Sequence, residues 1–126
     1  FIFIKIKIYI LDLLEVLTWF SSLAFIFFGI NCFMSEFIIE EFKRYKLPTF
    51  RKLIGFLQII GAIGLLIGLY YDPLILLLSS AGLGLLMIAG FVVRLKVKDN
   101  FIKSSPAFTF AIINIIIAIK TFRIYF

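Results

Sequence analysis

Histidine is absent from this 126-residue sequence, and cysteine occurs once, as Cys32. Without histidine no Ser-His-Asp triad can form, and one cysteine provides neither a Cys-x-x-Cys dithiol nor a Cys/His metal cluster. No glycine-rich phosphate loop follows a strand. These absences argue against a free-standing enzyme, and we expect no metal or other cofactor. A lone cysteine in an apolar helix is interpreted as a small hydrophobic side chain.

Charged residues are also scarce, at 16% of the chain, whereas hydrophobic residues make up 63%. With a mean hydropathy of +1.18, the chain has too little polar surface for a soluble domain, which indicates a lipid bilayer as its surroundings. The net charge of +6 comes from basic residues in short gaps between apolar runs. That pattern is typical of cytoplasmic membrane loops, and we expect no nucleic-acid partner.

Four apolar runs are close to the ~20 residues that a helix needs to cross a bilayer. They cover residues 8–34, 53–71, 74–93 and 107–122. Because backbone hydrogen bonds must close within each segment in lipid, the runs predict helices. The expected fold is an all-α integral membrane four-helix bundle, a single transmembrane domain over residues 1–126. The opening "FIFIKIKI" is interpreted as an interfacial lead-in whose Lys5 and Lys7 reach the head groups.

A short amphipathic helix is predicted between the first two spans, over residues 35–47. Its apolar residues share one stripe at i, i+4 and i+7: Ile38, Phe42 and Tyr45. Ser35 is placed to cap its start, Glu40 to pair with Arg44, and Pro48 to stop it. We expect this helix to lie in the membrane plane, the alternative being a solvated helical linker.

The distribution of lysine and arginine predicts the orientation of a four-span chain. The first-to-second and third-to-fourth connections carry Lys43, Arg44, Lys46, Arg51, Lys52, Arg94, Lys96, Lys98 and Lys103. The other side carries Lys5, Lys7, Lys120 and Arg123, together with Tyr9, Tyr70, Tyr71 and Tyr125. We therefore expect the basic loops in the cytoplasm and both termini outside, most simply in a bacterial cytoplasmic membrane.

Small residues indicate how the predicted helices pack, since helices in lipid associate through close backbone approach. The fourth span has Ala107, Ala111, Asn114 and Ala118 along one stripe. The first span repeats the spacing with Thr18, Ser22, Phe25 and Gly29. The second carries Gly61, Gly64 and Gly68, and the third has Ser80 and Gly84. These residues predict a tightly packed bundle.

Polar residues within the spans are the candidates for a ligand site, because such residues are costly in a membrane. A pocket that holds Glu15, Gln58 and Asn114 would bind the polar head of a quinone or lipid. The alternative is that Gln58 and Asn114 only join helices by hydrogen bonds. Pairing of Glu15 with Lys120 is also conceivable, but Lys120 projects away from the small-residue stripe, so we expect it to reach the outer head groups.

Two stretches resemble the DoxX-like family of small four-helix membrane proteins: "FKRYKLPTFRKLIGFLQIIGAIGLLIG" and "AGLGLLMIAGFVVRL". The first is similar to the family's aromatic, basic, Leu-Pro, aromatic and Gly-rich pattern. The second is similar to its Leu-x-x-Met-x-x-Ala/Gly turn, and the similarity covers about residues 21–119. Gln58 stands where many members have Glu, and Arg94 where His is frequent, which weakens any proton-handling or metal role borrowed from the family.

The resemblance implies one of two functions. The family is named after membrane subunits linked to thiosulfate:quinone oxidation, which implies an accessory or quinone/lipid-binding subunit of a membrane complex. Some similar proteins belong to redox-defence complexes, and distant animal relatives act in receptor assembly. The second hypothesis is therefore a structural or assembly partner of another membrane protein, with no ligand of its own.

Overall fold

The computed structural model describes the backbone of residues 2–126 and the side chains of residues 2, 4, 5 and 12–126. Its helices are α1 (Ile2–Met34), α2 (Glu36–Arg44), the short 3-10 helix η1 (Pro48–Phe50), α3 (Arg51–Tyr70), α4 (Pro73–Lys96) and α5 (Phe101–Tyr125). Four segments are long and apolar enough to cross a membrane: Asp12–Met34, Pro48–Tyr70, Pro73–Lys96 and Phe101–Tyr125. The all-α prediction with four long apolar helices is confirmed.

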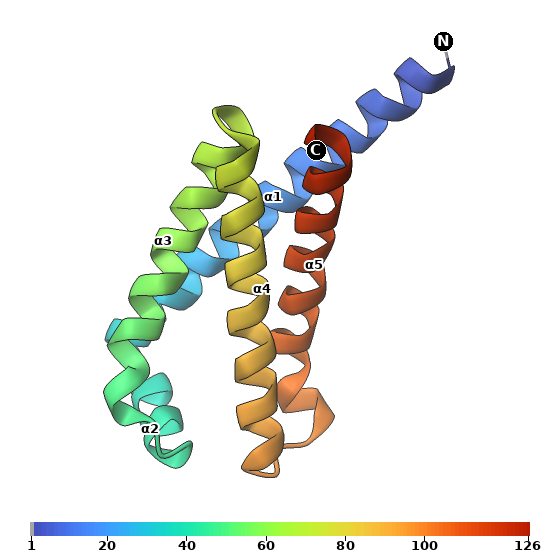
Figure 1. The fold of residues 1–126 in the computed structure, drawn as a ribbon. Coiled ribbons are helices and arrows are strands. Elements are labelled where there is room, and N and C mark those ends of the chain that lie inside the picture. Colours follow the sequence, from blue (N-terminus) through green and yellow to red (C-terminus); the bar gives the residue numbers. More distant parts are fainter. Residues whose placement is uncertain (1) are drawn as a thin grey trace.

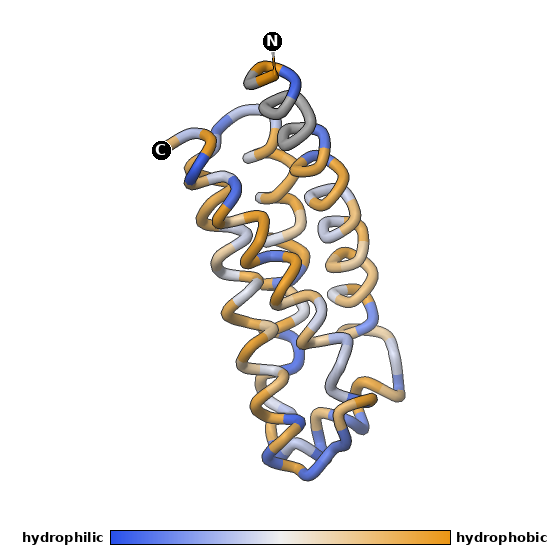
Figure 2. The backbone as a smooth tube through the Cα atoms, turned by 90° about the vertical axis from the view of Figure 1, so that its right-hand side faces the viewer, coloured by the Kyte–Doolittle hydropathy of each residue, from blue (hydrophilic) through white to orange (hydrophobic). Residues whose placement is uncertain are grey.

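The four long helices form two pairs, α1 with α3 and α4 with α5, and α3 joins the pairs by packing on α4. Both termini and the α3–α4 turn lie at one end, and α2 and the α4–α5 turn lie at the other (Figure 1). We call the end that holds α2 and the α4–α5 turn the basic end, and the end that holds both termini the opposite end. Hydrophilic residues gather at the basic end, whereas the long helices are largely hydrophobic (Figure 2).

The first helix begins at Ile2 rather than at the predicted residue 8, so the lead-in is helical over residues 2–8. A helix closes its backbone hydrogen bonds within the segment, which an extended lead-in without a neighbouring strand cannot do. Lys5 is exposed, in keeping with a position outside the packed bundle. The side chains of Lys7 and Tyr9 lie outside the described residues.

The last helix begins at Phe101, earlier than the predicted residue 107, although it contains Pro106. Asn100 starts it, because its Oδ1 accepts a hydrogen bond from the Lys103 backbone N–H at 2.9 Å. Pro106 has no N–H for the Ile102 carbonyl four residues earlier. The Ser105 hydroxyl donates to that carbonyl at 2.8 Å instead, which lets the helix continue through the proline.

The predicted short helix is present as α2, and Ser35 caps it by accepting from the Ile38 N–H at 3.4 Å. It ends at Arg44, before Pro48. The expected Glu40–Arg44 pair is wrong: Glu40 pairs with Lys43 at 3.4 Å, and Arg44 pairs with two other acids. Arg44 is drawn toward the α4–α5 turn, where Asp99 offers both carboxylate oxygens.

Close backbone approach holds α1 to α3. A Cβ on Gly55 would lie 3.1 Å from the Gly29 carbonyl oxygen, and one on Gly29 would lie 2.9 Å from the Gly55 oxygen. Further along, the buried Ser22 hydroxyl donates to the Ala62 carbonyl at 2.8 Å. Side chains larger than those of Gly29, Gly55 and Ser22 would keep the two helices apart here.

The glycines of α3 that follow Gly55 face α4 instead. A Cβ on Gly61 would lie 2.6 Å from Leu83, one on Gly64 would meet the Ser79 side chain, and one on Gly68 would lie 2.5 Å from the Leu76 Cα. Because the last of these contacts is with backbone, α3 and α4 are closest near their connecting turn.

The remaining residues of the predicted packing stripes lie mostly in the interior. Those that are buried are Thr18, Ser80, Gly84, Ala107 and Ala111, together with the large side chain of Phe25, while Ala118 is half-buried. Gly84 contacts α5, where a Cβ would lie 3.3 Å from Ile115. The Ser80 hydroxyl bonds to the Leu76 carbonyl of its own helix at 2.8 Å and thus does not join two helices.

Candidate functional site: a cavity at the basic end

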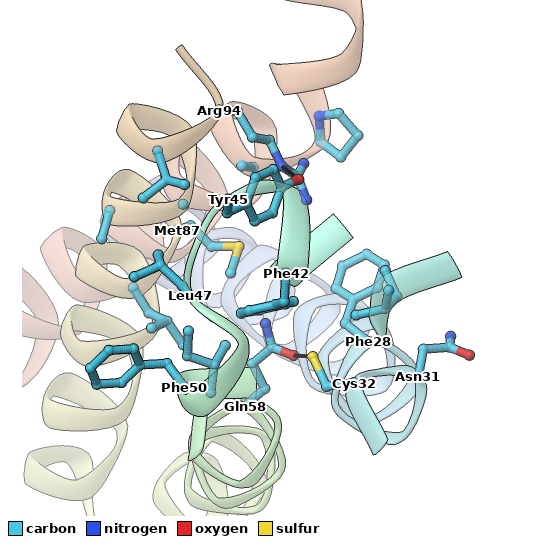
Figure 3. A pocket seen from close by; sticks show the side chains of 18 residues that line it. Phe28, Asn31, Cys32, Phe42, Tyr45, Leu47, Phe50, Gln58, Met87 and Arg94 are labelled. Carbon is cyan, nitrogen blue, oxygen red and sulfur yellow. Dashed lines mark hydrogen bonds between the residues drawn. The ribbon is translucent and has the colours of Figure 1, made fainter. Parts of the chain in front are cut away.

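A cavity of about 340 Å³ lies at the basic end, between α2 and the ends of the two helix pairs. Its walls come from the ends of all four long helices, from α2 and from η1. The apolar lining includes Phe28, Phe42, Leu47, Phe50, Ile54, Leu86, Met87 and Val93. The polar residues of the lining are Asn31, Cys32, Tyr45, Gln58 and Arg94, of which Asn31 points its amide away from the other four (Figure 3). A mostly apolar cavity with a few polar groups is the usual form of a small-molecule site.

Gln58 supplies the polar group on the α3 wall. Its side chain is only 6% exposed, and its Oε1 accepts a hydrogen bond from the Cys32 thiol at 3.7 Å. The amide nitrogen points to the cavity, toward Phe42 (Figure 3). Within residues 12–126 no hydrogen bond engages that nitrogen, so its two N–H donors are available to a ligand that carries an acceptor oxygen.

Tyr45 and Arg94 form a second polar group, on the opposite side of Phe42 and Met87 from Gln58 (Figure 3). Arg94 Nε donates to the Tyr45 hydroxyl oxygen at 3.1 Å, and Arg94 Nη1 donates to the Lys103 carbonyl at 3.3 Å. The Tyr45 hydroxyl in turn donates to Glu41 Oε2 at 3.0 Å. Burial raises the pKa of Tyr45, so the phenol stays neutral and remains a donor.

The Arg44 guanidinium connects α2 to the α4–α5 turn by a bidentate ion pair, which we call the clasp. Arg44 Nη1 and Nη2 each lie 2.9 Å from an oxygen of Asp99, and Nη2 also lies 2.6 Å from Glu41 Oε2. The Asp99 side chain is 6% exposed. Hydrogen bonds from Arg44 hold the pKa of both carboxyls below their ordinary values and raise the pKa of Arg44. All three groups are therefore charged at neutral pH.

The basic residues that were predicted to lie at the membrane surface divide into two sets. The three arginines bind within the chain: Arg44 in the clasp, Arg94 to Tyr45, and Arg51 to the Cys32 carbonyl at the end of α1. The lysines are exposed at the basic end: Lys43, Lys46, Lys52, Lys96, Lys98 and Lys103. The arginine guanidinium holds its N–H donors in one plane, which suits arginine to hydrogen bonds within the chain.

The structure does not bring Glu15, Gln58 and Asn114 into one pocket. Glu15 lies at the opposite end, where its Oε1 accepts from the Tyr70 hydroxyl at 2.9 Å; Lys120 is not its partner. Asn114 is fully buried, and its Oδ1 accepts from the Ser21 hydroxyl at 3.0 Å, which joins α5 to α1. Of the three, Gln58 alone lines the cavity.

Several residues of the site were missed by sequence reasoning. Cys32 was interpreted as a small hydrophobe, and Tyr45 only as part of an apolar stripe. Asp99 carries a signal that sequence alone offers, because it is the one acid among the basic residues of "RLKVKDNFIK". In the part of the chain that the structure describes, no cluster of acidic or cysteine side chains is close enough together to hold a metal ion.

The cavity, the α2 residues that line it and the glycine contacts all fall within a segment that matches a known family. A profile of the DoxX-like family matches residues 16–119, which is most of the chain. The chain belongs to the DoxX-like family. It is accordingly a membrane protein whose four apolar helices contact the lipid bilayer. No curated protein and no solved structure matches this DoxX-like chain.

Proposed function

We propose that this DoxX-like protein binds a quinone in the cavity at the basic end and performs no catalysis of its own. The Gln58 amide nitrogen carries the proposal, because a buried donor that points into an apolar cavity selects a ligand with an acceptor oxygen. A quinone carbonyl has that chemistry, and its ring suits walls lined by Phe28, Phe42 and Met87. An ester carbonyl of a lipid is the other source of the same acceptor.

The proposal also places the protein in a larger assembly. We infer that it is an accessory subunit of a redox-linked complex in a bacterial cytoplasmic membrane, an inference supported by family membership. The basic end would face the cytoplasm with α2 at the membrane interface, and both termini would lie outside. Six exposed lysines at the basic end support this orientation, because positive charge is retained in the cytoplasm.

Replacing Gln58 with leucine is expected to weaken quinone binding while the bundle stays folded. The substitution keeps the side-chain volume but removes the donor, and loss of one hydrogen bond to a neutral group reduces affinity by roughly three- to tenfold. Binding is measured by equilibrium dialysis of the purified protein against a short-chain benzoquinone. Mass spectrometry of the protein extracted from its membrane identifies what the cavity holds.

Asn114→Leu serves as the control, because it removes a buried amide that does not line the cavity. That variant is expected to bind the benzoquinone as the parent does, per folded molecule. Equal affinity of the Gln58→Leu variant and the parent would disprove the proposed contact. A bound phospholipid that benzoquinone does not displace would assign the cavity to a lipid. A stoichiometric protein partner with neither ligand would favour the assembly hypothesis.

The orientation is tested by the accessibility of single cysteines in a Cys32→Ala background. Asp72→Cys lies at the α3–α4 turn and Lys46→Cys lies at the basic end, so the two report on opposite sides of the membrane. On intact cells an impermeant thiol reagent is expected to label the first variant only. Labelling of the second variant alone would reverse the orientation, and labelling of both would contradict a single topology.

A further inference from the structure

We propose that α2 is a movable cover of the cavity and that the clasp between Arg44 and Asp99 sets how often the cover opens. The physiological part of this inference, control of ligand entry, rests on the proposed function. The mechanical part stands on the contacts of α2 alone. It concerns the basic end, where side chains of α2 and its C-cap reach the α4–α5 pair.

The apolar stripe of α2 forms one wall of the cavity, but the helix is weakly embedded. Ile38, Phe42 and Tyr45 line the cavity, and no residue of α2 is buried. The helix packs on η1 and on the end of α1, which belong to its own side of the cavity. It reaches the other helix pair through the side chains of Arg44 and Tyr45. A segment with few buried contacts opens at lower free energy than the rest of a fold.

Two similar turns bring the partners of the clasp together. After α2, Lys46 has φ of 63°, and the Leu47 N–H bonds to the Phe42 carbonyl at 2.9 Å. After α4, Lys98 has φ of 66°, and the Asp99 N–H bonds to the Arg94 carbonyl at 2.9 Å. Both are helix-ending turns with a left-handed residue, a conformation that the backbone bonds fix in place. Arg44 and Asp99 are thereby presented from ordered ends of two helices.

The clasp is also stronger than a typical surface ion pair. Its two parallel N–H to oxygen bonds are charge-assisted and fix the geometry of the pair, and the Asp99 side chain is only 6% exposed, although that of Arg44 is 38% exposed. The Lys43–Glu40 pair on the same helix differs in both respects. Its side chains are 61% and 72% exposed, and it stays within α2, so it provides a matched control.

Cys32 reports the opening directly, because it is the single cysteine of the chain, lines the cavity and is 5% exposed. The full chain in lipid nanodiscs is treated with N-ethylmaleimide at fixed pH, and the rate of Cys32 modification is followed by mass spectrometry. When the cover closes faster than the thiol reacts, the rate measures the open population. Arg44→Gln and Asp99→Asn are each expected to raise it by about three- to tenfold.

The double variant Arg44→Gln/Asp99→Asn is expected to react no faster than either single variant, because all three lack the same pair. Lys43→Gln is expected to react at the parental rate. A parental rate in the Arg44→Gln and Asp99→Asn variants would overturn the proposal. So would a faster rate accompanied by an equal loss of global stability in a denaturing-detergent titration, since this would indicate unfolding of the bundle.

The same assay separates this proposal from the proposed function, because labelling needs no ligand. Faster labelling in the clasp variants supports a movable cover whether or not quinone binds. Added benzoquinone with all four ring positions substituted, which has no free position for addition of a thiol, supports control of ligand entry if it protects Cys32 in the parent and less in the clasp variants. Benzoquinone that leaves the labelling rate of every variant unchanged would refute control of quinone entry and leave the movable cover in place.

Discussion

Gly68→Ala is expected to destabilise the bundle by about 3 kcal/mol. The added Cβ would lie 2.5 Å from the Leu76 Cα and 2.8 Å from its Cβ. A flexible side chain rotates away from such a contact, but backbone does not, and Leu76 is itself only 1% exposed. The two helices must therefore separate at the turn that connects them, which also loosens the Gly64–Ser79 contact beside it. Unfolding in a titration with denaturing detergent, followed by circular dichroism, measures the loss.

Gly82→Ala is the matched control for this substitution. Gly82 lies on α4, and nothing is found within 4 Å of a Cβ built on it. Because alanine favours a helix over glycine by about 1 kcal/mol in soluble hosts, the control is expected to be neutral or slightly stabilising. A Gly68→Ala protein as stable as the Gly82→Ala protein would contradict the close α3–α4 approach.

Asn114→Asp is the second substitution with a large expected effect. It is expected to lower the free energy of unfolding by about 3 kcal/mol. Asn114 is fully buried between α5 and α1, and its Nδ2 donates to the Phe110 carbonyl at 2.8 Å. An aspartate of nearly the same shape places a carboxylate oxygen against that carbonyl, in a site that water does not reach. Asn114→Leu removes the hydrogen bonds without introducing charge and is expected to cost only ~0.6 to 2 kcal/mol.

The same exchange at Asn100 separates the cost of burial from that of the chemical change. Asn100 is exposed and caps the start of α5, a position where aspartate performs as well as asparagine and favours the helix dipole. Asn100→Asp is thus expected to keep the parental stability in the same detergent titration. If Asn114→Asp also kept nearly the parental stability, the α1–α5 contact would be open to water.

Hydrophobic length was sufficient to predict the four long helices, because every backbone group in lipid must be satisfied within its own helix. Their ends were harder to predict. The start of α5 depends on a hydroxyl that replaces the N–H missing at Pro106, and the pairing of Arg44 depends on Asp99, 55 residues away in the chain. Both depend on contacts that appear only when the chain is folded.

The candidate site was predicted in part. Gln58 was selected as the one amide of the second apolar run, 53–71, and it lines the cavity. It was grouped with Glu15 and Asn114 because all three are polar residues within the predicted spans. Because α1 and α3 run antiparallel, Glu15 meets Tyr70 at the opposite end, whereas Gln58 meets Cys32 near the basic end. Polarity within a span does not by itself place two residues at the same end of the bundle.

The glycine contacts between α3 and α4 give the bundle the mechanics of a lever. Backbone contact at Gly68 and Leu76 fixes the two helices at the opposite end, while the cavity keeps them apart at the basic end. The 20 residues of α3 span roughly 30 Å. The part of α3 between Gly68 and Arg51 is about 26 Å long, so a rotation of about 5° around the fixed contact moves the far end by roughly 2.2 Å. A small rotation at the tightly packed contact thus changes the separation of α3 and α4 by an ångström or more at the cavity, where a ligand would sit.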